Sequence, residues 1–319
     1  MKSTLLTTAA ALAALTSASP ISRRADGPTD GEILNYALTL EHLESTFYSD
    51  ALAKYTAADF SSANFTQETY ERVKTIAADE AAHVSFLTAG LKAAGATPVE
   101  ACTYDFGYTD VASFLATASV LEGVGVSAYL GAAADIMSKT YLTAAGSILT
   151  VEARHAAYIR NSISEAPFPA PFDNPLGYNE VYTLAAQFIK SCPESNPKLP
   201  VKAFPVLSAK PADTGKMGIY GGDEIVVSTP GYAIEGEVYA AFVTVTGPVF
   251  VDVKAVEGGF EVMVPKEGVT GQSYLVLTSC NTAATDDTIV AGPAIVEVMA
   301  AAMSQVKKPN LIFDLCQII

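Results

Sequence analysis

Histidine and basic residues are scarce in this chain of 319 residues. It contains three histidines, and its 19 Lys and Arg stand against 34 Asp and Glu, a formal net charge of −15. Such an acidic surface repels nucleic acid and anionic membranes and attracts cations. Cysteine is also rare, with four in all, and none has a zinc-ligand spacing to a histidine, which argues against zinc or thiol chemistry. Beyond the N-terminus, we expect no segment to be long and apolar enough to span a bilayer.

The first residues have the features of an export signal. Residues 1–19 combine a charged start at Lys2, an Ala/Leu-rich stretch over 5–15 and small residues before a cleavage point, which predicts a secretory signal peptide. Residues 20–28 then form a linker or short propeptide, with Arg23-Arg24 as a dibasic processing signal. We therefore expect a secreted, extracellular protein with no membrane span.

The remaining chain divides by the period of its apolar residues. A period of 3.6 predicts helices over about 29–56, 66–94, 109–138, 142–164 and 179–190. From about residue 200 the period approaches 2, with strands expected near 238–245, 249–253, 260–264 and 274–278 between glycine-rich turns. This predicts an α+β multidomain chain: a helical bundle over 29–198 and a β-sandwich-like domain over 199–319.

The four cysteines fit export to an oxidising compartment. Four cysteines allow three disulfide connectivities, and we favour Cys102–Cys192 with Cys280–Cys316, because each pair then lies within one expected domain. Asn64 begins an Asn-Phe-Thr sequon in the polar segment 57–66, which is expected to be a loop, so we expect it to be glycosylated.

Two of the three histidines share one motif. His83 follows Glu80 by three residues, and His155 follows Glu152 by three. On a helix this spacing places the carboxylate and the imidazole on one face, and in both segments that face is the apolar stripe that a bundle buries. His42 instead faces polar residues and is expected to be exposed.

Two further glutamates share this inward placement. Glu41 lies on the apolar stripe of the first predicted helix and Glu122 on that of the third. Glu44 is a rival to Glu41, because its own face is also apolar, and periodicity alone leaves the two open. After Glu122 come Gly123 and Gly125, which predict a close helix approach, a π-bulge or room for a small ligand.

Four buried carboxylates require compensating charge, because an unpaired buried charge is costly and like charges repel. Two divalent cations would neutralise four glutamates and two neutral imidazoles. The order Glu, Glu-x-x-His, Glu, Glu-x-x-His over four helices is that of the di-iron or di-manganese site of ferritin-like bundles. The predicted metal ligands are therefore Glu41, Glu80, His83, Glu122, Glu152 and His155.

Residues beside these ligands are expected to support them. We expect Glu80 and Glu152 to bridge the two metals and to be the catalytic pair. Asp79 either orients His155 or pairs with Arg154. Tyr48 and Tyr129 are candidate donors or radical-accepting side chains near the centre.

The first half resembles the ferritin-like family of secreted fungal proteins linked to stress response and sexual development, related to plant desiccation-related proteins. Besides the motifs above, this resemblance is carried by Cys102-Thr103-Tyr104-Asp105-Phe106, the segment 121–129 and Ser191-Cys192-Pro193. It covers about residues 29–205, while the later Ala291-Gly292-Pro293 is a weaker match. The wider pattern places a tyrosine seven residues after the ligand glutamate of the first helix, which favours Glu41, followed by Tyr48, over Glu44.

Two functions follow as expectations. The first is a secreted redox protein with two metal ions, which we expect to be iron rather than manganese. It would react with O₂ or peroxide in stress or development. Its activity would be that of an oxidase, a ferroxidase or a catalase-like enzyme. Its partners are then metal ions and a small oxidant. The second is an extracellular structural protein whose bundle binds metal for stability or not at all, and whose β half contacts a cell wall or surface. The two differ in metal content and in turnover.

Overall fold

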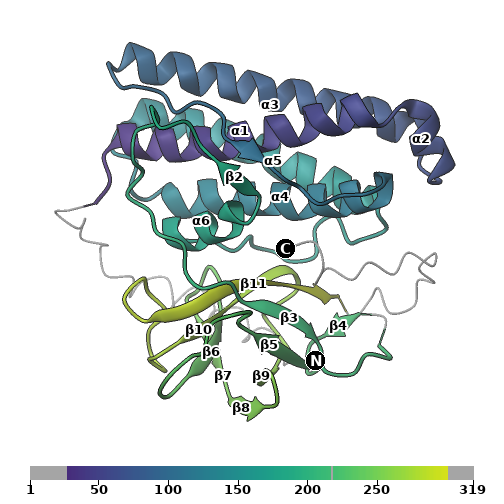
Figure 1. Cartoon of the computed structure of the whole chain (residues 1–319), viewed down its shortest axis with the longest axis vertical. Coiled ribbons are helices and arrows are strands. Elements are labelled where there is room, and N and C mark those ends of the chain that lie inside the picture. The colour runs from purple at the N-terminus through teal and green to yellow at the C-terminus, as the bar shows by residue number, and fades with distance from the viewer. Residues whose placement is uncertain (1–26, 217, 301–319) are drawn as a thin grey trace, which may run out of the picture.

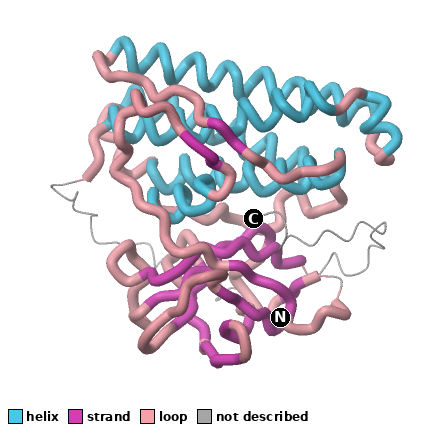
Figure 2. Tube along the Cα trace, viewed as in Figure 1, coloured by secondary structure: helices cyan, strands magenta, loops and turns pink. Residues whose placement is uncertain are grey.

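Helices occupy the first half of the chain and strands the second, in two stacked layers (Figure 1, Figure 2). The computed structural model describes residues 27–216 and 218–300. The expected signal peptide, Arg23-Arg24 and Cys316 lie outside these residues. The expected boundary at 198/199 lies in the connection between the two layers and stays a prediction.

Four long helices form the bundle. They are α1 (Asp30–Lys54), α3 (Gln67–Ala93), α4 (Val111–Ala132) and α5 (Lys139–Ser162). Thr29 caps α1, and Thr29 and Glu32 form a reciprocal capping box. Helix α1 packs on α3, and α4 packs on α5. The family expectation of a four-helix bundle is therefore confirmed.

Two shorter elements refine the predicted helix limits. The segment after α1, expected as a loop, contains α2 (Ala57–Ser62), whose Thr56 and Asp59 form another capping box. Helix α4 ends at Ala132 rather than near 138, because Ser138 instead caps α5. The last predicted helix is α6 (Tyr178–Ala186), shorter than expected because the chain turns at 187–188 into the strand β2 (Ile189–Ser191).

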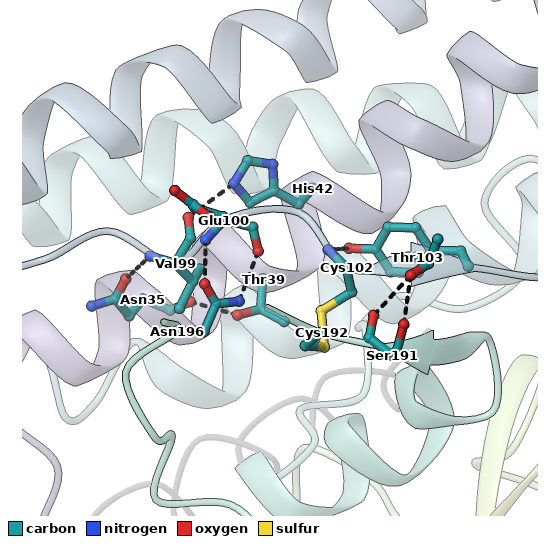
Figure 3. The surroundings of a disulfide bond; sticks show 11 residues. Asn35, Thr39, His42, Val99, Glu100, Cys102, Thr103, Ser191, Cys192 and Asn196 are labelled. Atoms are coloured by element: carbon teal, nitrogen blue, oxygen red, sulfur yellow. Dashed lines mark hydrogen bonds between the residues drawn. A yellow bond between two sulfur atoms is a disulfide. The ribbon is translucent and has the colours of Figure 1, made fainter. Parts of the chain in front are cut away.

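A disulfide ties the long connection between α3 and α4 to the segment that follows β2. Cys102 and Cys192 are bonded, as predicted. They flank the short antiparallel pair of β1 (Thr103–Tyr104) and β2 (Figure 3). Cys280 forms no disulfide within the described residues, and because Cys316 lies outside them, the second pairing stays a prediction.

Side chains of α1 also contact the connection between α3 and α4. Asn35 donates to the Thr97 carbonyl at 3.0 Å and accepts from the Val99 amide at 2.9 Å. His42 Nε2 lies 3.1 Å from the Val99 carbonyl oxygen (Figure 3). The expectation that His42 is exposed is wrong. It is half-buried, because the connection crosses the face that periodicity alone reads as solvent-facing.

The β half is a sandwich of two sheets. One sheet has the order β4-β11-β10-β6-β7 and the other β3-β5-β9-β8. Residues of both sheets form one apolar core, which includes Ile225, Val262, Phe242 and Leu277. The bounds are β3 (Ser208–Pro211), β4 (Ile219–Tyr220), β5 (Glu224–Ser228), β6 (Tyr239–Phe242), β7 (Val249–Val251), β8 (Val253–Val256), β9 (Gly259–Met263), β10 (Gly271–Thr278) and β11 (Ile289–Met299).

The longest strand, β11, was not predicted. It contains Gly292 and Pro293, which normally mark the end of a strand. The pairing with β10 absorbs them as an irregularity: Leu275 faces Ala294, whereas Leu277 faces Ala291. Gly292 has a φ of +106°, a conformation that glycine adopts without strain.

The sandwich is joined to the bundle through buried polar contacts. Tyr274 of β10 lies in the bundle core, where its hydroxyl donates to the Gly123 carbonyl at 3.0 Å. Gln272 donates to the Val120 carbonyl at 3.1 Å. A Cβ at Gly123 would lie 2.6 Å from the Gln272 side chain, so this glycine accounts for the close approach of β10 to α4.

Helix α4 corrects one expectation about membrane spans. It has 22 residues, and an 18-residue stretch within it has a mean hydropathy of 1.5, so by length and composition it could cross a membrane, contrary to the reading of the sequence. However, 83% of this apolar stretch is buried inside the protein. Helix α4 packs against α5 and α1 within the bundle and against β10 of the sandwich.

Candidate metal centre

Six donor side chains from the four long helices meet in the interior of the bundle. Helix α1 supplies Glu41, α4 supplies Glu122, and α3 and α5 each supply one Glu-x-x-His pair. All four glutamates have 0% exposure and His155 has 6%, while His83 is half-buried. The inward placement follows from helical phase, because each donor shares a face with the aliphatic residues that form the core.

The donors form two overlapping groups. Glu41, Glu80, His83 and Glu152 compose the first; Glu80, Glu122, Glu152 and His155 compose the second. Within each group the donor atoms all lie within 4.8 Å of one another. Glu80 and Glu152 belong to both groups, which gives the arrangement two adjacent positions for a cation with two shared carboxylates.

Each imidazole faces several carboxylates through one ring nitrogen. His83 Nδ1 lies 3.2 Å from Glu41 Oε2, 3.3 Å from Glu80 Oε2 and 3.2 Å from Glu152 Oε1. His155 Nδ1 lies 2.9 Å from Glu80 Oε1 and 3.4 Å from Glu122 Oε2. One nitrogen carries at most one proton, so it cannot satisfy two or three oxygens by hydrogen bonding alone.

Several of these buried atoms make no well-aligned hydrogen bond, although all but Glu152 Oε2 lie 2.9–3.4 Å from an imidazole nitrogen or a carboxylate oxygen of the cluster. They are Glu80 Oε1, Glu122 Oε2, both oxygens of Glu152 and His155 Nδ1. Unpaired buried polar atoms are rare in folded proteins because they lose hydration without replacement. Adjacent ligands of a six-coordinate ion with bonds of about 2.1 Å lie about 3 Å apart, close to the separations seen here. The residues present therefore fit bound metal ions.

Two tyrosines hold the outer oxygens of the terminal carboxylates. Tyr48 donates its hydroxyl to Glu122 Oε1, and Tyr129 donates to Glu41 Oε1. In each case the second oxygen faces an imidazole: Glu41 Oε2 faces His83, and Glu122 Oε2 faces His155. Both tyrosines are buried. Each hydroxyl therefore fixes the rotamer that aims its carboxylate at the centre.

Asp79 lies behind His155, as one of the two hypotheses for it required. Its Oδ2 is 3.2 Å from His155 Nε2, the ring nitrogen that points away from the cluster. A proton on Nε2 would leave Nδ1 free to act as a ligand. Arg154, the other candidate partner, is exposed and, within the described part of the chain, makes no ion pair with Asp79.

Burial and mutual charge shift the pKa values of these groups when no cation is bound. Burial raises the pKa of Glu41 to about 7 and raises the pKa of Glu122 and Glu152 as well. Burial also disfavours ionised Glu80, but the two imidazoles outweigh it and lower its pKa to about 2. Despite burial, the surrounding carboxylates raise the pKa of His83 to about 12 and that of His155 to about 11. In the metal-free protein, protons therefore provide the neutralising charge.

A fifth buried glutamate adjoins the centre. Glu44, the rival to Glu41, is 4% exposed, and burial followed by the charge of Glu152 raises its pKa well above the usual value. Glu41, not Glu44, belongs to the first donor group. A Cβ at Gly125 would lie 3.0 Å from Glu44 Oε1 and 3.2 Å from Glu152 Oε2, so this glycine leaves the space that both carboxylates occupy.

The predicted glycosylation site lies away from this centre. Asn64 is exposed just after α2, with a φ of +66°. An exposed position is what a glycan needs, and the modification itself stays a prediction.

Comparison with known proteins agrees with this architecture. Residues 29–165 match the family model described as the ferritin-like domain. The helical half of the chain is thus similar to a ferritin-like domain, and it contains a buried Glu/His cluster that could hold metal ions.

A fungal protein is among the relatives of this chain. The chain is 28% identical over 178 residues to Protein rds1 of Schizosaccharomyces pombe, a stretch that covers 56% of this chain and 44% of that protein. The match therefore spans less than half the length of this relative. These two matches confirm the resemblance to a ferritin-like fungal family that the motifs predicted.

Proposed function

We propose that the bundle binds two metal ions, iron in preference to manganese, and that the protein is a secreted redox enzyme acting on O₂ or a peroxide. The observation that supports this most directly is the set of buried donor atoms on Glu80, Glu122, Glu152 and His155 that make no well-aligned hydrogen bond. Oxygen and nitrogen donors suit both metals, so the choice of iron rests on family likeness.

The two donor groups support one assignment of the ligands. Glu41 and His83 would bind one ion, and Glu122 and His155 the other, with Glu80 and Glu152 shared between them. When bound, two iron ions supply electrons that reduce O₂ or peroxide, whereas two manganese ions favour peroxide disproportionation. The four carboxylates would then be ionised and the imidazoles neutral, which balances two divalent charges.

The surrounding residues prepare this site. Tyr48 and Tyr129 hold Glu122 and Glu41 in place through their hydroxyls, and Asp79 holds His155. Aliphatic core residues exclude bulk water, which strengthens every charge interaction inside the bundle. A proton released on metal loading leaves from His83 Nδ1 or His155 Nδ1, the atoms that face the carboxylates.

Secretion is the second part of the proposal. The Cys102–Cys192 disulfide is a feature of proteins that fold in oxidising compartments. The apolar, small-residue composition of residues 1–19 supports cleavage of a signal peptide there. N-terminal sequencing of the exported protein would test it, with a start between residues 20 and 29 expected.

Metal analysis followed by turnover tests the function. Elemental mass spectrometry of the purified secreted chain should give about two iron ions per protein, and the loaded protein should consume O₂ or peroxide. Glu80→Gln should remove both properties. Glu71→Gln, an exposed change on the same helix, should alter neither.

The remaining outcomes separate the two functions. Metal without turnover would favour the alternative, an extracellular structural or surface-binding protein. A folded protein that holds no iron or manganese, even after anaerobic loading with Fe²⁺, would end the redox proposal.

A further inference from the structure

An apolar cavity of about 50 Å³ lies between all four long helices. Its walls include Ile33 and Ala37 from α1, Phe86 and Gly90 from α3, Tyr129 from α4 and Ala145 from α5. Phe86 is 54% exposed and Gly90 is half-buried. The α3 side of the cavity therefore adjoins the protein surface.

The inner wall of this cavity is one side chain away from the proposed metal centre. Tyr129 lines the cavity, and its hydroxyl donates to Glu41. Leu40, the residue before Glu41, lines the same cavity and also a second one of about 20 Å³. The second cavity is lined by Glu44 and Gly125, which adjoins Glu152. The two cavities thus approach the carboxylates from different sides.

Volume and polarity restrict what the first cavity can hold. A dry apolar cavity of roughly 150 Å³ holds benzene or xenon, so one of about 50 Å³ suits an atom or a diatomic molecule. Its walls are almost entirely apolar, so water or hydrogen peroxide would lose hydrogen bonds on entering. Dioxygen has no such loss, because it makes only weak hydrogen bonds with water.

We propose that this cavity binds dioxygen and that dioxygen passes from it to the proposed metal centre. The supply role rests on the proposed function and narrows it, because it selects O₂ over peroxide as the oxidant. Dioxygen would enter beside Phe86 and Gly90 and lie against the ring of Tyr129, adjacent to Glu41.

Two glycines offer a matched pair of variants. A Cβ at Gly90 or at Gly146 would meet no heavy atom within 4 Å, both positions are half-buried within helices, and only Gly90 lines the cavity. Gly90→Phe should fill the cavity, and Gly146→Phe should not. Circular dichroism and thermal unfolding would verify that both variants fold.

Xenon tests the gas site without any metal. Crystals of the metal-free full-length secreted chain under xenon pressure should show one xenon beside Tyr129 in wild type and in Gly146→Phe, and none in Gly90→Phe. An empty cavity in wild type, or xenon retained in Gly90→Phe at the same place, would overturn the proposed site.

Kinetics test the supply role. In the iron-loaded protein, Gly90→Phe should raise the KM for O₂ several-fold while leaving the KM for hydrogen peroxide unchanged. Equal KM values for O₂ in all three proteins would overturn supply through this cavity, even where xenon binds. If loaded wild type consumes no O₂, the redox function fails and the supply role with it, whereas bound xenon would still support the gas site.

Discussion

His155 and Asp79 join two helices of the bundle at the back of the donor cluster. Asp79 Oδ2 lies 3.2 Å from His155 Nε2, while Nδ1 of the same ring faces Glu80 and Glu122. The side chain of Asp79 is 44% exposed and that of His155 only 7%. A partly solvated carboxylate thus sets the orientation of a buried imidazole.

Asp79→Ala should weaken metal binding without unfolding the protein. Loss of a carboxylate behind a ligand histidine typically costs about 10- to 100-fold in metal affinity. Competition with a chelator of known affinity would measure it. Asp79→Asn should fall between wild type and Asp79→Ala, because the amide oxygen can still accept a hydrogen bond from the Nε2–H group of His155. Unchanged metal content and affinity in Asp79→Ala would discard this role for Asp79.

The metal-free protein should lose stability as the pH rises from about 4.5, where unfolded Glu41 titrates, to about 11 or 12, where the two folded imidazoles titrate. Folding raises the pKa of Glu41 from 4.5 to about 7, and those of His83 and His155 from 6.5 to about 12 and about 11. The folded state therefore binds more protons than the unfolded chain over this range, and its free energy of unfolding falls with pH. Each extra proton bound by the folded state lowers the free energy of unfolding by about 1.4 kcal/mol for every unit of rising pH.

Glu80 acts in the opposite direction at lower pH. Its folded pKa of about 2 lies below the ordinary 4.5, so its contribution is present above pH 4.5 and is lost as the pH falls towards 2. Thermal unfolding with a strong chelator, compared with the metal-loaded protein, would measure both trends. Bound metal should remove the decline above pH 5, because it replaces the protons. A flat chelated profile would contradict these assignments.

Tyr129→Phe and Tyr48→Phe should each destabilise the metal-free protein by about 1–3 kcal/mol, because each leaves a buried carboxylate oxygen without its donor. Tyr129 donates a hydrogen bond to Glu41, and Tyr48 donates one to Glu122. Urea denaturation would give the free energies of unfolding. Tyr232→Phe, on an exposed tyrosine of the β half, should change stability by less than about 0.5 kcal/mol. Equal stability of all variants would show that these hydroxyls do not hold the carboxylates.

Arg160 should anchor the sandwich to the bundle. Its two terminal nitrogens donate to Glu297 at 2.6 Å and 3.0 Å, and one of them lies 3.3 Å from Glu165 Oε2. The guanidinium is buried, so Arg160→Met should cost about 3–5 kcal/mol by leaving carboxylates without their cation.

Two variants give this experiment its contrast. Arg160→Lys keeps the charge but loses the two-pronged geometry and should cost less. Arg72→Met, at a side chain 57% exposed, should change the urea midpoint little. A small effect of Arg160→Met, similar to that of Arg72→Met, would show that the ion pair does not hold the two halves together.

Periodicity predicted the long helices well because each buries one apolar stripe, and the stripe fixes which residues face inward. It failed where another segment changes what a face contacts. Periodicity placed His42 on a solvent-facing side, whereas in the structure the connection at Val99 covers it. Strand β11 escaped prediction because Gly292 and Pro293 imply an interruption, while pairing with β10 accommodates them.

The sequence by itself determined the helical phase of the six donors, because a residue spacing of three or four sets the face of a helix regardless of its neighbours. It also determined the need for compensating charge. Only the tertiary structure decided that Asp79 contacts His155 rather than Arg154, that Glu44 adjoins the centre, and that an apolar cavity ends at Tyr129. Such relations join residues far apart in the chain, and the packing of whole helices and sheets sets their distances.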